Sequence, residues 1–347
     1  MASSHIGVKY FSQENLLDSG CFNITEAIEV IEQSMIGYMN KRVLMPDKTV
    51  QIFNNATQDR INVLPATLLD EMVCGVKWVS VFPNNPKNFG KQNVSAVIIL
   101  SEIESGFPIA FMEGTLVSNI RTAAISAIGA KYLAIKEPNT IGFIGAGENA
   151  KMNLMAMKSV RPSLKTCKVS SRTIETEAKF IEDMSRTIPD MEFIVCNTIY
   201  QKAIEDSDII VTATSTQADL LKADWIKKGA FYSHIGGWED EYKVALKADK
   251  IVCDDWESVK HRGQTISRMY QEGILHDTGI HANIGEIITK QKAGRETNEE
   301  FIYFNTVGLS YADVALAYHM YNKAKDTEHV TNLTMQETRI FDHSMFK

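Results

Sequence analysis

A glycine-rich turn between an apolar run and a helix-forming segment constrains this chain more than any other feature. Thr140-Ile-Gly-Phe-Ile144 predicts a buried strand, and Gly145-Ala-Gly147-Glu-Asn-Ala150 leads directly into the helix-forming residues 151–160. The first glycine of such a turn allows a tight bend, the second lets the backbone approach a pyrophosphate, and the small third residue lets helix and strand pack closely. We therefore expect a dinucleotide to contact Gly145, Ala146, Gly147, Glu148 and Asn149.

Strands and helices alternate from residue 139 onward. Short apolar runs that predict strands are separated by amphipathic segments such as Thr176–Ser185. The runs are Thr140–Ile144, Cys167–Ser170, Glu192–Val195, Ile209–Thr212, Phe231–His234 and Lys250–Val252. Alternation of this kind predicts parallel βαβ units in a doubly wound sheet, so the expected fold class is α/β.

The first third of the chain has a different pattern. Residues 24–42 predict an amphipathic helix, and the β-rich runs that follow predict a mixed, mostly antiparallel sheet in an α+β domain. These runs are Thr49–Phe53, Ile61–Leu64, Cys74–Val81, Ser95–Leu100 and Pro108–Glu113. Ser118–Ala134 predicts a linker helix, and Tyr311–Lys325 predicts a last helix that returns to the first domain. We expect domains of 1–120 with 309–347, and of 121–308.

Composition excludes several classes of function. The 347 residues are 44% hydrophobic and 23% charged, which is ordinary for a soluble protein of two domains. A net charge of −7 argues against nucleic acid as a partner, and no apolar run is long enough to span a membrane. The five scattered cysteines are typical of reduced core residues in a cytoplasmic protein, and the eight histidines form no metal-binding motif.

The end of the second predicted strand bears on the choice of dinucleotide. An acidic residue there binds the ribose hydroxyls of NAD, whereas a basic residue favours the phosphate of NADP. This chain has Lys168-Val-Ser-Ser-Arg-Thr173, with hydroxyls at Ser171 and Thr173 and a guanidinium at Arg172. We therefore favour NADP over NAD, although Arg172 could also be an ordinary surface residue. Further along, Thr212, Ala213 and Thr214 end a strand that would border the adenosine.

Two cations stand in apolar surroundings. Arg121 begins a helix of small apolar residues, and Lys77 lies between Val76 and Trp78 in a predicted strand. A charge buried there needs a partner, which could be an internal acid or an anionic ligand. Strand alternation could also turn Lys77 outward to water, so these residues alone leave structure and ligand equally open.

The sequence resembles the ornithine cyclodeaminase/μ-crystallin family over nearly its whole length. The matching pieces, in order, are Gly75-Val-Lys77, Arg121-Thr-Ala-Ala, Gly145-Ala-Gly147, Val211-Thr-Ala-Thr-Ser-Thr, Lys228-Gly-Ala and Val307-Gly-Leu. Within the family it is similar to dehydrogenases that form 2,3-diaminopropionate. That similarity rests on Gly75-Val-Lys-Trp78, Asn84-Asn-Pro86, Lys247-Ala-Asp-Lys250, Asp254-Asp-Trp256 and Gly294-Arg-Glu296. The family implies a Rossmann domain at 121–308 and a substrate-binding domain that dimerises through its sheet.

The resemblance also implies roles for individual residues. Lys48, Lys77 and Arg121 would hold the substrate α-carboxylate, in keeping with the geometry of a bidentate arginine assisted by lysines. Ser95, Thr122 and Thr306 match positions that contact the cofactor in the family.

Two departures from the family pattern concern catalysis. Cyclodeaminases carry an acid/base aspartate four residues before a lysine; here Glu239 and Lys243 occupy those positions, and Asp240 is the adjacent candidate. Asn62 stands where cyclodeaminases have a glutamate, which argues against ornithine cyclisation. A further conflict is that the diaminopropionate branch looks NAD-like, whereas Ser171-Arg-Thr173 resembles μ-crystallin, which uses NADPH.

The expected activity is a nicotinamide-dependent oxidoreduction at the carbon–nitrogen bond of a small amino-acid substrate. The specific hypothesis that the resemblance supports is oxidative hydrolysis of N-(2-amino-2-carboxyethyl)-glutamate to 2,3-diaminopropionate and 2-oxoglutarate. Alternatives are a ketimine or pyrroline-2-carboxylate reductase that uses NADPH, an ornithine cyclodeaminase, and a binding protein without turnover. Intact Lys48, Lys77 and Arg121 argue against the binding protein.

Overall fold

Two kinds of apolar pattern in the sequence correspond to two sheets in separate compact units. The computed structural model describes residues 5–346. Unit 1 comprises the described residues up to Asn23, together with Asn40–Ser118 and those from Ser310 onward; unit 2 comprises Ile24–Met39 and Asn119–Leu309. No helix within the described residues is both long and apolar enough to cross a membrane.

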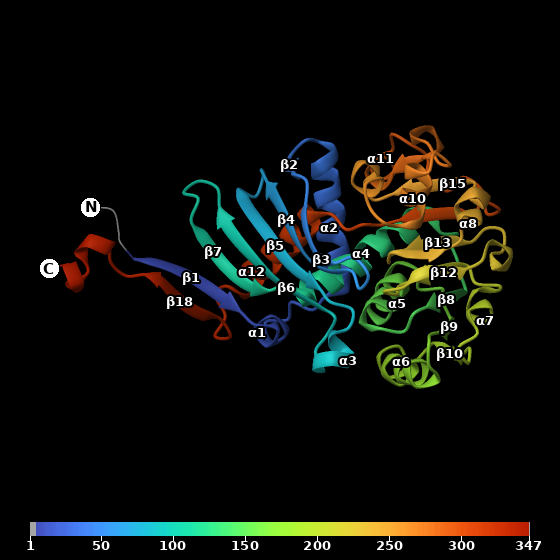
Figure 1. Ribbon diagram of the computed structural model, residues 1–347, viewed down its shortest axis with the longest axis horizontal. Helices are drawn as coiled ribbons and strands as arrows, with labels where there is room; N and C mark the ends of the chain where they lie inside the picture. The colour runs from blue at the N-terminus through green and yellow to red at the C-terminus, as the bar shows by residue number, and fades with distance from the viewer. Residues whose placement is uncertain (1–4, 347) are drawn as a thin grey trace. The chain divides into compact units, whose positions relative to one another are not determined.

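Unit 1 is built on one mixed sheet (Figure 1). Among its described strands, β1 and β7 pair in parallel and the other pairings are antiparallel. Its strands, in sheet order, are β18 (Thr331–Gln336), β1 (Ile6–Phe11), β7 (Pro108–Glu113), β6 (Val94–Glu102), β5 (Val73–Val81), β4 (Asp59–Leu68) and β2 (Val43–Leu44). β3 (Thr49–Asn54) also pairs with β4. The expected mostly antiparallel sheet is confirmed.

Strict alternation along β5 gives this sheet a covered face and an outer face. Val73, Gly75, Lys77 and Val79 are buried, whereas Trp78 between them is 45% exposed. Helix α12 (Ser310–Ala324) packs on β4, β5 and β6, and Gly75 leaves room for Val314 of that helix. The unit also contains the short α-helices α1 (Gln13–Asp18) and α3 (Asn85–Phe89) and the 3₁₀ helices η3 (Ile340–Asp342) and η4 (Ser344–Phe346).

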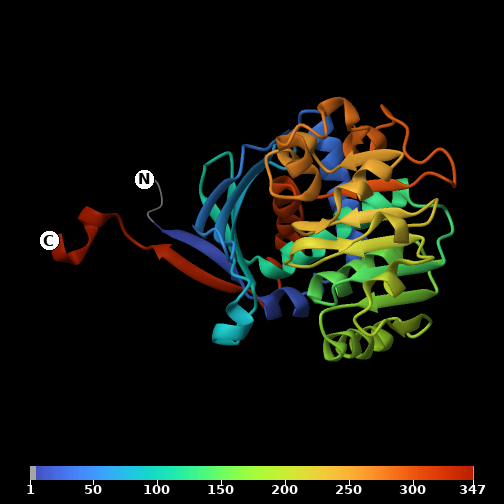
Figure 2. The same ribbon diagram turned by 45° about the vertical axis from the view of Figure 1, so that its right-hand side comes forward.

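Unit 2 contains a wholly parallel sheet (Figure 2). Its strands, in sheet order, are β10 (Glu192–Val195), β9 (Thr166–Ser170), β8 (Thr140–Ile144), β11 (Ile209–Thr212), β13 (Phe231–His234), β17 (Ile302–Asn305), β15 (Lys250–Cys253) and β16 (Ala282–Asn283). Chain order runs outward from β8 through β9 and β10 on one side and through β11 and β13 on the other, so the topological switch point lies between β8 and β11. Beyond β13, β17 lies between β13 and β15. Ligands of doubly wound sheets bind at the switch point, beyond the carboxyl ends of the strands.

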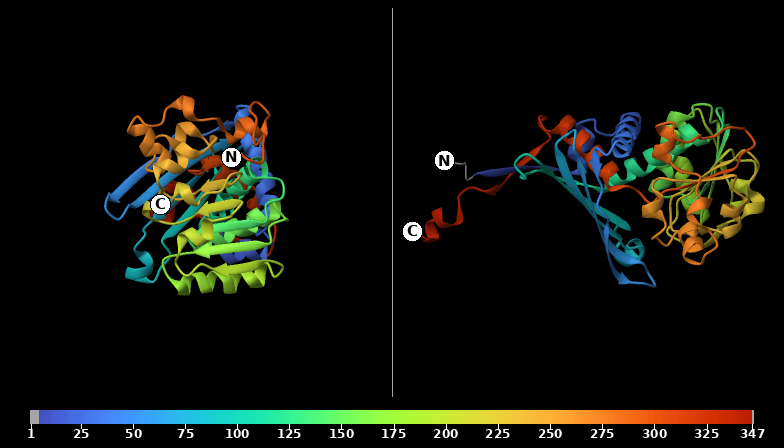
Figure 3. Two further views of the ribbon diagram at one scale, coloured as in Figure 1. Left: turned by 90° about the vertical axis from the view of Figure 1, so that its right-hand side faces the viewer. Right: turned by 90° about the horizontal axis from the view of Figure 1, so that it is seen from above.

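Helices complete unit 2 (Figure 3). They are α2 (Ile24–Met39), α4 (Thr115–Leu133), whose first turn belongs to unit 1, α5 (Glu148–Val160), α6 (Ile174–Thr187), α7 (Tyr200–Ile204), α8 (Tyr242–Lys247), α9 (Trp256–Val259), α10 (Thr265–Gln271) and α11 (Ile284–Ile288). A separate pair of strands, β12 (Gln217–Leu221) and β14 (Trp238–Asp240), is parallel. Ala123, Ala124, Ala127 and Ala130 of α4 are fully buried, because small side chains let a helix approach its neighbours closely.

The structure differs from the expected domain boundaries in one important respect. The divisions at Ser118/Asn119 and Leu309/Ser310 lie within two residues of the expected ones, but α2 belongs to unit 2 and not to the first domain. Helix α2 packs on α5 and α11, which its apolar stripe alone could not reveal.

Candidate active site

The glycine turn begins directly after β8, and its two glycines meet different surroundings. Gly145 has φ +106°, and a Cβ added to it would lie 2.5 Å from the carbonyl oxygen of Ala213. A Cβ on Gly147 would meet no atom within 4 Å. Gly147 is the N-cap of α5 but supplies no side-chain hydrogen bond, and the nearby Asn149 Oδ1 is buried without a hydrogen-bond partner. Open space at a helix N-terminus fits a dinucleotide phosphate.

The end of β9 presents the residues expected to select the dinucleotide. Arg172 and Thr173 are exposed, whereas Ser171 is buried and its hydroxyl donates to Thr173 O over 2.9 Å. The fully buried Glu177 accepts from the amides of Ser171, Asn197 and Thr198 over 2.8–2.9 Å, which joins the ends of β9 and β10. The carboxylate of Glu177 is therefore occupied by backbone amides of the protein. Arg172 is the exposed charged side chain at the end of β9.

Lys77 points to the covered face of the unit 1 sheet. Its ammonium donates to Asp313 Oδ1 over 2.7 Å and to Ser118 Oγ over 3.2 Å. Lys77 is 1% exposed and Asp313 is fully buried, so the charges form an ion pair away from bulk water. The sequence left open whether Lys77 faces water or an internal acid, and the structure pairs it with an acid of α12.

Two other site residues expected in unit 1 are Lys48 and Ser95. Lys48 is half-buried in the segment between β2 and β3, and Ser95 lies on β6 with its side chain exposed. The register aligns Ser95 with Ser80 of β5, whose hydroxyl donates to the Ser95 carbonyl over 3.1 Å.

Arg121 and Thr122 are both half-buried and lie on α4. The position of Arg121 shows why the Val307-Gly-Leu motif requires a glycine at 308. A side chain on Gly308, which has φ +78°, would overlap the Arg121 guanidinium. The amides of Val307 and Gly308 both donate to Asp254 Oδ2 over 2.9 Å. Burial raises the pKa of Asp254 to about 7 even though it accepts these hydrogen bonds. The Arg121 motif and the Val307-Gly-Leu motif, which are far apart in the sequence, therefore meet at the backbone turn around Gly308.

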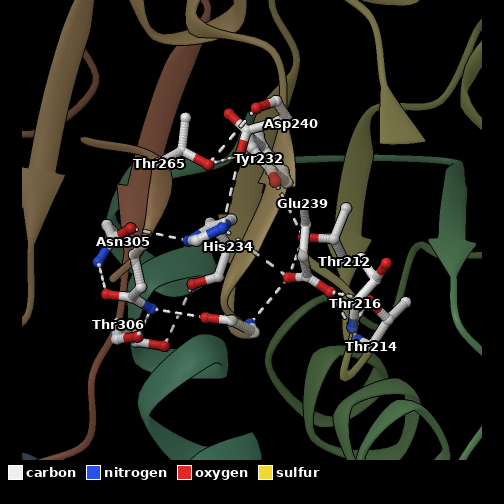
Figure 4. A network of polar contacts seen from close by, with 12 residues as sticks. Thr212, Thr214, Thr216, Tyr232, His234, Glu239, Asp240, Thr265, Asn305 and Thr306 are labelled. Atoms are coloured by element: carbon white, nitrogen blue, oxygen red, sulfur yellow. Dashed lines mark hydrogen bonds and ion pairs between the residues drawn. The ribbon is translucent and has the colours of Figure 1, made fainter. Parts of the chain in front are cut away.

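Glu239 lies at the centre of a buried network beside the carboxyl end of β11 (Figure 4). Its Oε1 accepts from the amide and the hydroxyl of Thr214, each over 2.6 Å. Its Oε2 accepts from Thr212 Oγ1 and from the amide of Gly236, each over 2.8 Å. Of the residues predicted from sequence, the structure brings Glu239, Thr212 and Thr214 together. Lys243 lies on α8 and is exposed.

Asp240 lies in the same network, beside a buried histidine (Figure 4). Its Oδ1 accepts from Thr265 Oγ1 over 2.6 Å and lies 3.4 Å from His234 Nε2. His234 Nδ1 lies 2.7 Å from Asn305 Oδ1, and the backbone of His234 accepts from the Thr306 hydroxyl over 3.3 Å. Full burial of the Asp240 carboxyl raises its pKa to about 6.

The raised pKa of Asp240 predicts how stability depends on pH. In the folded state the Asp240 carboxyl keeps its proton above the ordinary pKa of 3.8. The protonated carboxyl's contribution to the free energy of unfolding therefore declines as pH rises from about 4 to about 6. Asp240→Asn removes the titration and should gain on the wild type by on the order of 2–3 kcal/mol between pH 4 and pH 8. Urea unfolding at both values measures the difference, with the exposed Asp219→Asn as control. A constant difference would contradict the assignment.

Several site residues were absent from the sequence-based expectations. Asp313 could have been predicted as the partner of Lys77. It is a lone acid in the apolar first turns of a helix, just as Lys77 is a lone cation in an apolar strand. Gln264, which donates to the carbonyls of Gly236 and Thr306 over 2.8 Å, carries no comparable signal. Gln264 reaches these two carbonyls only when the folded chain brings it beside Gly236 and Thr306.

Comparison with protein families identifies the chain's relatives. The profile of the ornithine cyclodeaminase/mu-crystallin family matches residues 16–328. An N-((2S)-2-amino-2-carboxyethyl)-L-glutamate dehydrogenase of Staphylococcus aureus is 32% identical over 283 residues, which are 81% of this chain and 84% of the relative. The resemblance seen in the sequence motifs is thereby confirmed.

Solved structures of similar fold have related activities. A Delta(1)-pyrroline-2-carboxylate reductase of Thermococcus litoralis, in complex with NADH and L-proline, has a TM-score of 0.89 and 31% identity and covers 94% of this chain and 100% of its own. An archaeal alanine dehydrogenase dimer with bound NAD has a TM-score of 0.87 and 30% identity, with coverage of 95% and 100%. The expected combination of a Rossmann domain with a mixed-sheet domain is confirmed by these neighbours.

Proposed function

Because the chain belongs to the ornithine cyclodeaminase/mu-crystallin family, we propose that it is a nicotinamide-dependent oxidoreductase of amino or imino acids. The observation that carries this proposal is the turn at Gly145–Gly147, which combines a left-handed glycine, open space and the N-terminus of α5. The specific reaction we propose is the oxidative hydrolysis of N-(2-amino-2-carboxyethyl)-glutamate. Its support is the similarity to the dehydrogenase of S. aureus.

The proposed chemistry assigns separate tasks to the bound nicotinamide and to the protein. When bound, the nicotinamide supplies the hydride acceptor; the Cα–H and N–H bonds of the substrate are replaced by a C=N bond, which water hydrolyses to 2-oxoglutarate and 2,3-diaminopropionate. Lys77, held by Asp313, is proposed to bind the carboxylate and polarise the nitrogen or water. Arg121 is proposed to orient the carboxylate through a bidentate contact, and Lys48 to add positive charge.

Reduced-nicotinamide absorbance after substrate addition tests the proposed reaction. The purified protein with N-(2-amino-2-carboxyethyl)-glutamate and NAD or NADP should give one reduced nicotinamide and one 2-oxoglutarate per substrate consumed. Lys77→Met should abolish the signal. If neither dinucleotide is reduced with this compound or with a panel of other N-alkyl amino acids, the dehydrogenase proposal fails.

A second candidate is the reduction of pyrroline-2-carboxylate. It is favoured by the similarity to the reductase of T. litoralis, which was solved with NADH and L-proline. The two reactions run in opposite directions with respect to the nicotinamide. Oxidation of NADPH or NADH on addition of pyrroline-2-carboxylate, with proline as product, would establish the reductase in preference to the dehydrogenase.

The exposed Arg172 is proposed to favour NADP over NAD through the ribose phosphate. Arg172→Asp should remove this attraction and offer a carboxylate to the ribose hydroxyls. We expect the ratio of the NADP and NAD dissociation constants to shift toward NAD by about tenfold or more. Titration of intrinsic fluorescence with each dinucleotide measures the ratio, with Lys179→Ala, an exposed cation of the following helix α6, as control. An unchanged ratio would mean that Arg172 is an ordinary surface residue.

We further propose a homodimer that forms through the outer face of the unit 1 sheet. Strand register aligns Pro65, Val76, Ile99, Phe111 and Tyr10 in one row across five strands. Large apolar areas on a soluble protein favour association, and a solved archaeal neighbour is a dimer. Sedimentation should show a dimer that Trp78→Lys dissociates.

We also propose a reducing compartment such as the cytoplasm, because no disulfide joins any of the five cysteines.

A further inference from the structure

Glu239 occupies the place of a family acid/base, yet its carboxylate is surrounded by donors from the protein. A carboxylate has two oxygens with about four acceptor positions in all. The amide and hydroxyl of Thr214, the hydroxyl of Thr212 and the amide of Gly236 direct four hydrogen bonds at these positions. Glu239 is also 0% exposed. A group so occupied is badly placed to exchange a proton with a substrate.

The order of donors along the network is consistent with this reading. Thr212 Oγ1 lies 2.8 Å from Tyr232 OH as well as 2.8 Å from Glu239 Oε2. A threonine hydroxyl has one proton, and the carboxylate can only accept it, so the tyrosine must donate to Thr212. Likewise the Thr214 hydroxyl donates to Glu239 and accepts from the Thr216 amide over 3.2 Å. Both chains of hydrogen bonds end at Glu239.

The backbone that Glu239 holds is in contact with the dinucleotide turn. A Cβ on Gly145 would lie 2.5 Å from Ala213 O and 3.1 Å from Thr214 Cγ2, so the loop after β11 forms the wall against which the turn is built. Gly236, which also donates to Glu239, has no room for a side chain, because any side chain there would overlap the Glu239 carboxylate. Glu239 thus fixes the position of the 213–216 loop relative to Gly145.

We propose that Glu239 is a positioning residue of the dinucleotide site, which holds the Ala213–Thr216 loop against Gly145, and that it does not transfer the reaction's proton. This inference rests on the proposed function, because it assigns a dinucleotide to the glycine turn. It accounts for the glycine at 236 and for the hydroxyls at 212 and 214 through one buried carboxylate.

Glu239→Gln is a sharp test because each carboxylate oxygen accepts from one backbone amide. Thr214 N donates to Oε1 and Gly236 N donates to Oε2. Hydroxyls can rotate, but a backbone N–H cannot, so either orientation of the glutamine places its NH₂ against a fixed donor. In the full-length protein without dinucleotide, amide hydrogen exchange at Thr214 and Gly236 should become faster. The dissociation constants of NAD and NADP, measured calorimetrically, should rise about ten- to a hundredfold.

Matched variants separate positioning from proton transfer. Thr214→Val keeps the shape of the side chain but lacks the hydroxyl, and should weaken dinucleotide binding in the same direction; Thr214→Ser should restore it. Glu299→Gln, on an exposed side chain of the same unit, should change nothing. At saturating dinucleotide, the pH profile of kcat for Glu239→Gln should keep the wild-type shape.

Two results would have distinct meanings. Wild-type exchange and affinity in Glu239→Gln, together with a kcat reduced about 10²–10⁴-fold and a lost limb of the pH profile, would overturn the inference and assign Glu239 to acid/base catalysis. A wild-type protein that binds neither dinucleotide would instead refute the proposed function, while hydrogen exchange at Thr214 would still report on the loop.

Discussion

Replacing Asp313 with alanine is expected to lower the free energy of unfolding by about 3–5 kcal/mol. The substitution leaves the Lys77 ammonium, which is 1% exposed, without the carboxylate that lies 2.7 Å from it. Attraction inside a protein interior offsets the cost of desolvating two charges only while both are present. Urea unfolding followed by circular dichroism measures the change, and the same variant should lose activity because the lysine is no longer held in place.

Two further variants show whether the loss comes from the buried charge. Lys77→Met combined with Asp313→Leu replaces the pair by apolar side chains and should recover most of the stability without recovering activity. Asp70→Ala removes the partner of Arg42 in a pair whose side chains are 53% and 56% exposed, so its unfolding midpoint should stay close to that of the wild type. If Asp313→Ala behaves like Asp70→Ala, Lys77 is not dependent on its acid partner.

Gly147→Val should reduce dinucleotide affinity by about a hundredfold, or roughly 3 kcal/mol, without lowering stability. The added side chain meets no protein atom within 4 Å of its Cβ, and the backbone at Gly147 has an ordinary φ of −83°. It would, however, occupy the space through which a pyrophosphate approaches the amides at the start of α5. Calorimetric titration gives the affinity, and thermal unfolding without ligand gives the stability.

Gly145→Ala provides the contrast two residues earlier. Its φ of +106° disfavours any side chain, and the Cβ would lie 2.5 Å from Ala213 O, so we expect lower stability even without ligand. Equal behaviour of the two variants, either both folded normally with weak binding or both unstable, would show that the two glycines do not have the separate roles assigned to them.

The centre of the parallel sheet could be predicted from sequence because strands such as β8, β11, β13 and β15 are buried on both faces. Runs such as Thr140–Ile144 and Phe231–His234 are continuous and bounded by turns, and the structure has strands with these bounds. β17 and the β12–β14 pair were not predicted, although β17 is as long as the predicted β13. Their existence depends on neighbours supplied by distant parts of the chain.

The candidate site could be predicted in part for a similar reason. Glycine positions carry local geometry, so Gly145 and Gly147 were identified without knowledge of the fold. The sequence also raised the question of a partner for Lys77, but 236 residues separate it from Asp313, and no local pattern links them. Glu239 could be matched to a family position, whereas the four donors around it come from β11, its loop and the turn at Gly236, which only the folded chain brings together.

The division of the chain also determines the order in which its parts can be completed during synthesis. Every residue of unit 2 precedes Ser310, whereas unit 1, which contains the described N-terminal strand, still lacks α12 and β18 when Leu309 is added. Until α12 emerges from the ribosome, β4, β5 and β6 lack the helix that packs on them and Lys77 lacks Asp313. Translation at about 5–20 residues per second therefore allows unit 2 to fold while unit 1, whose first strands were made earlier, is still incomplete.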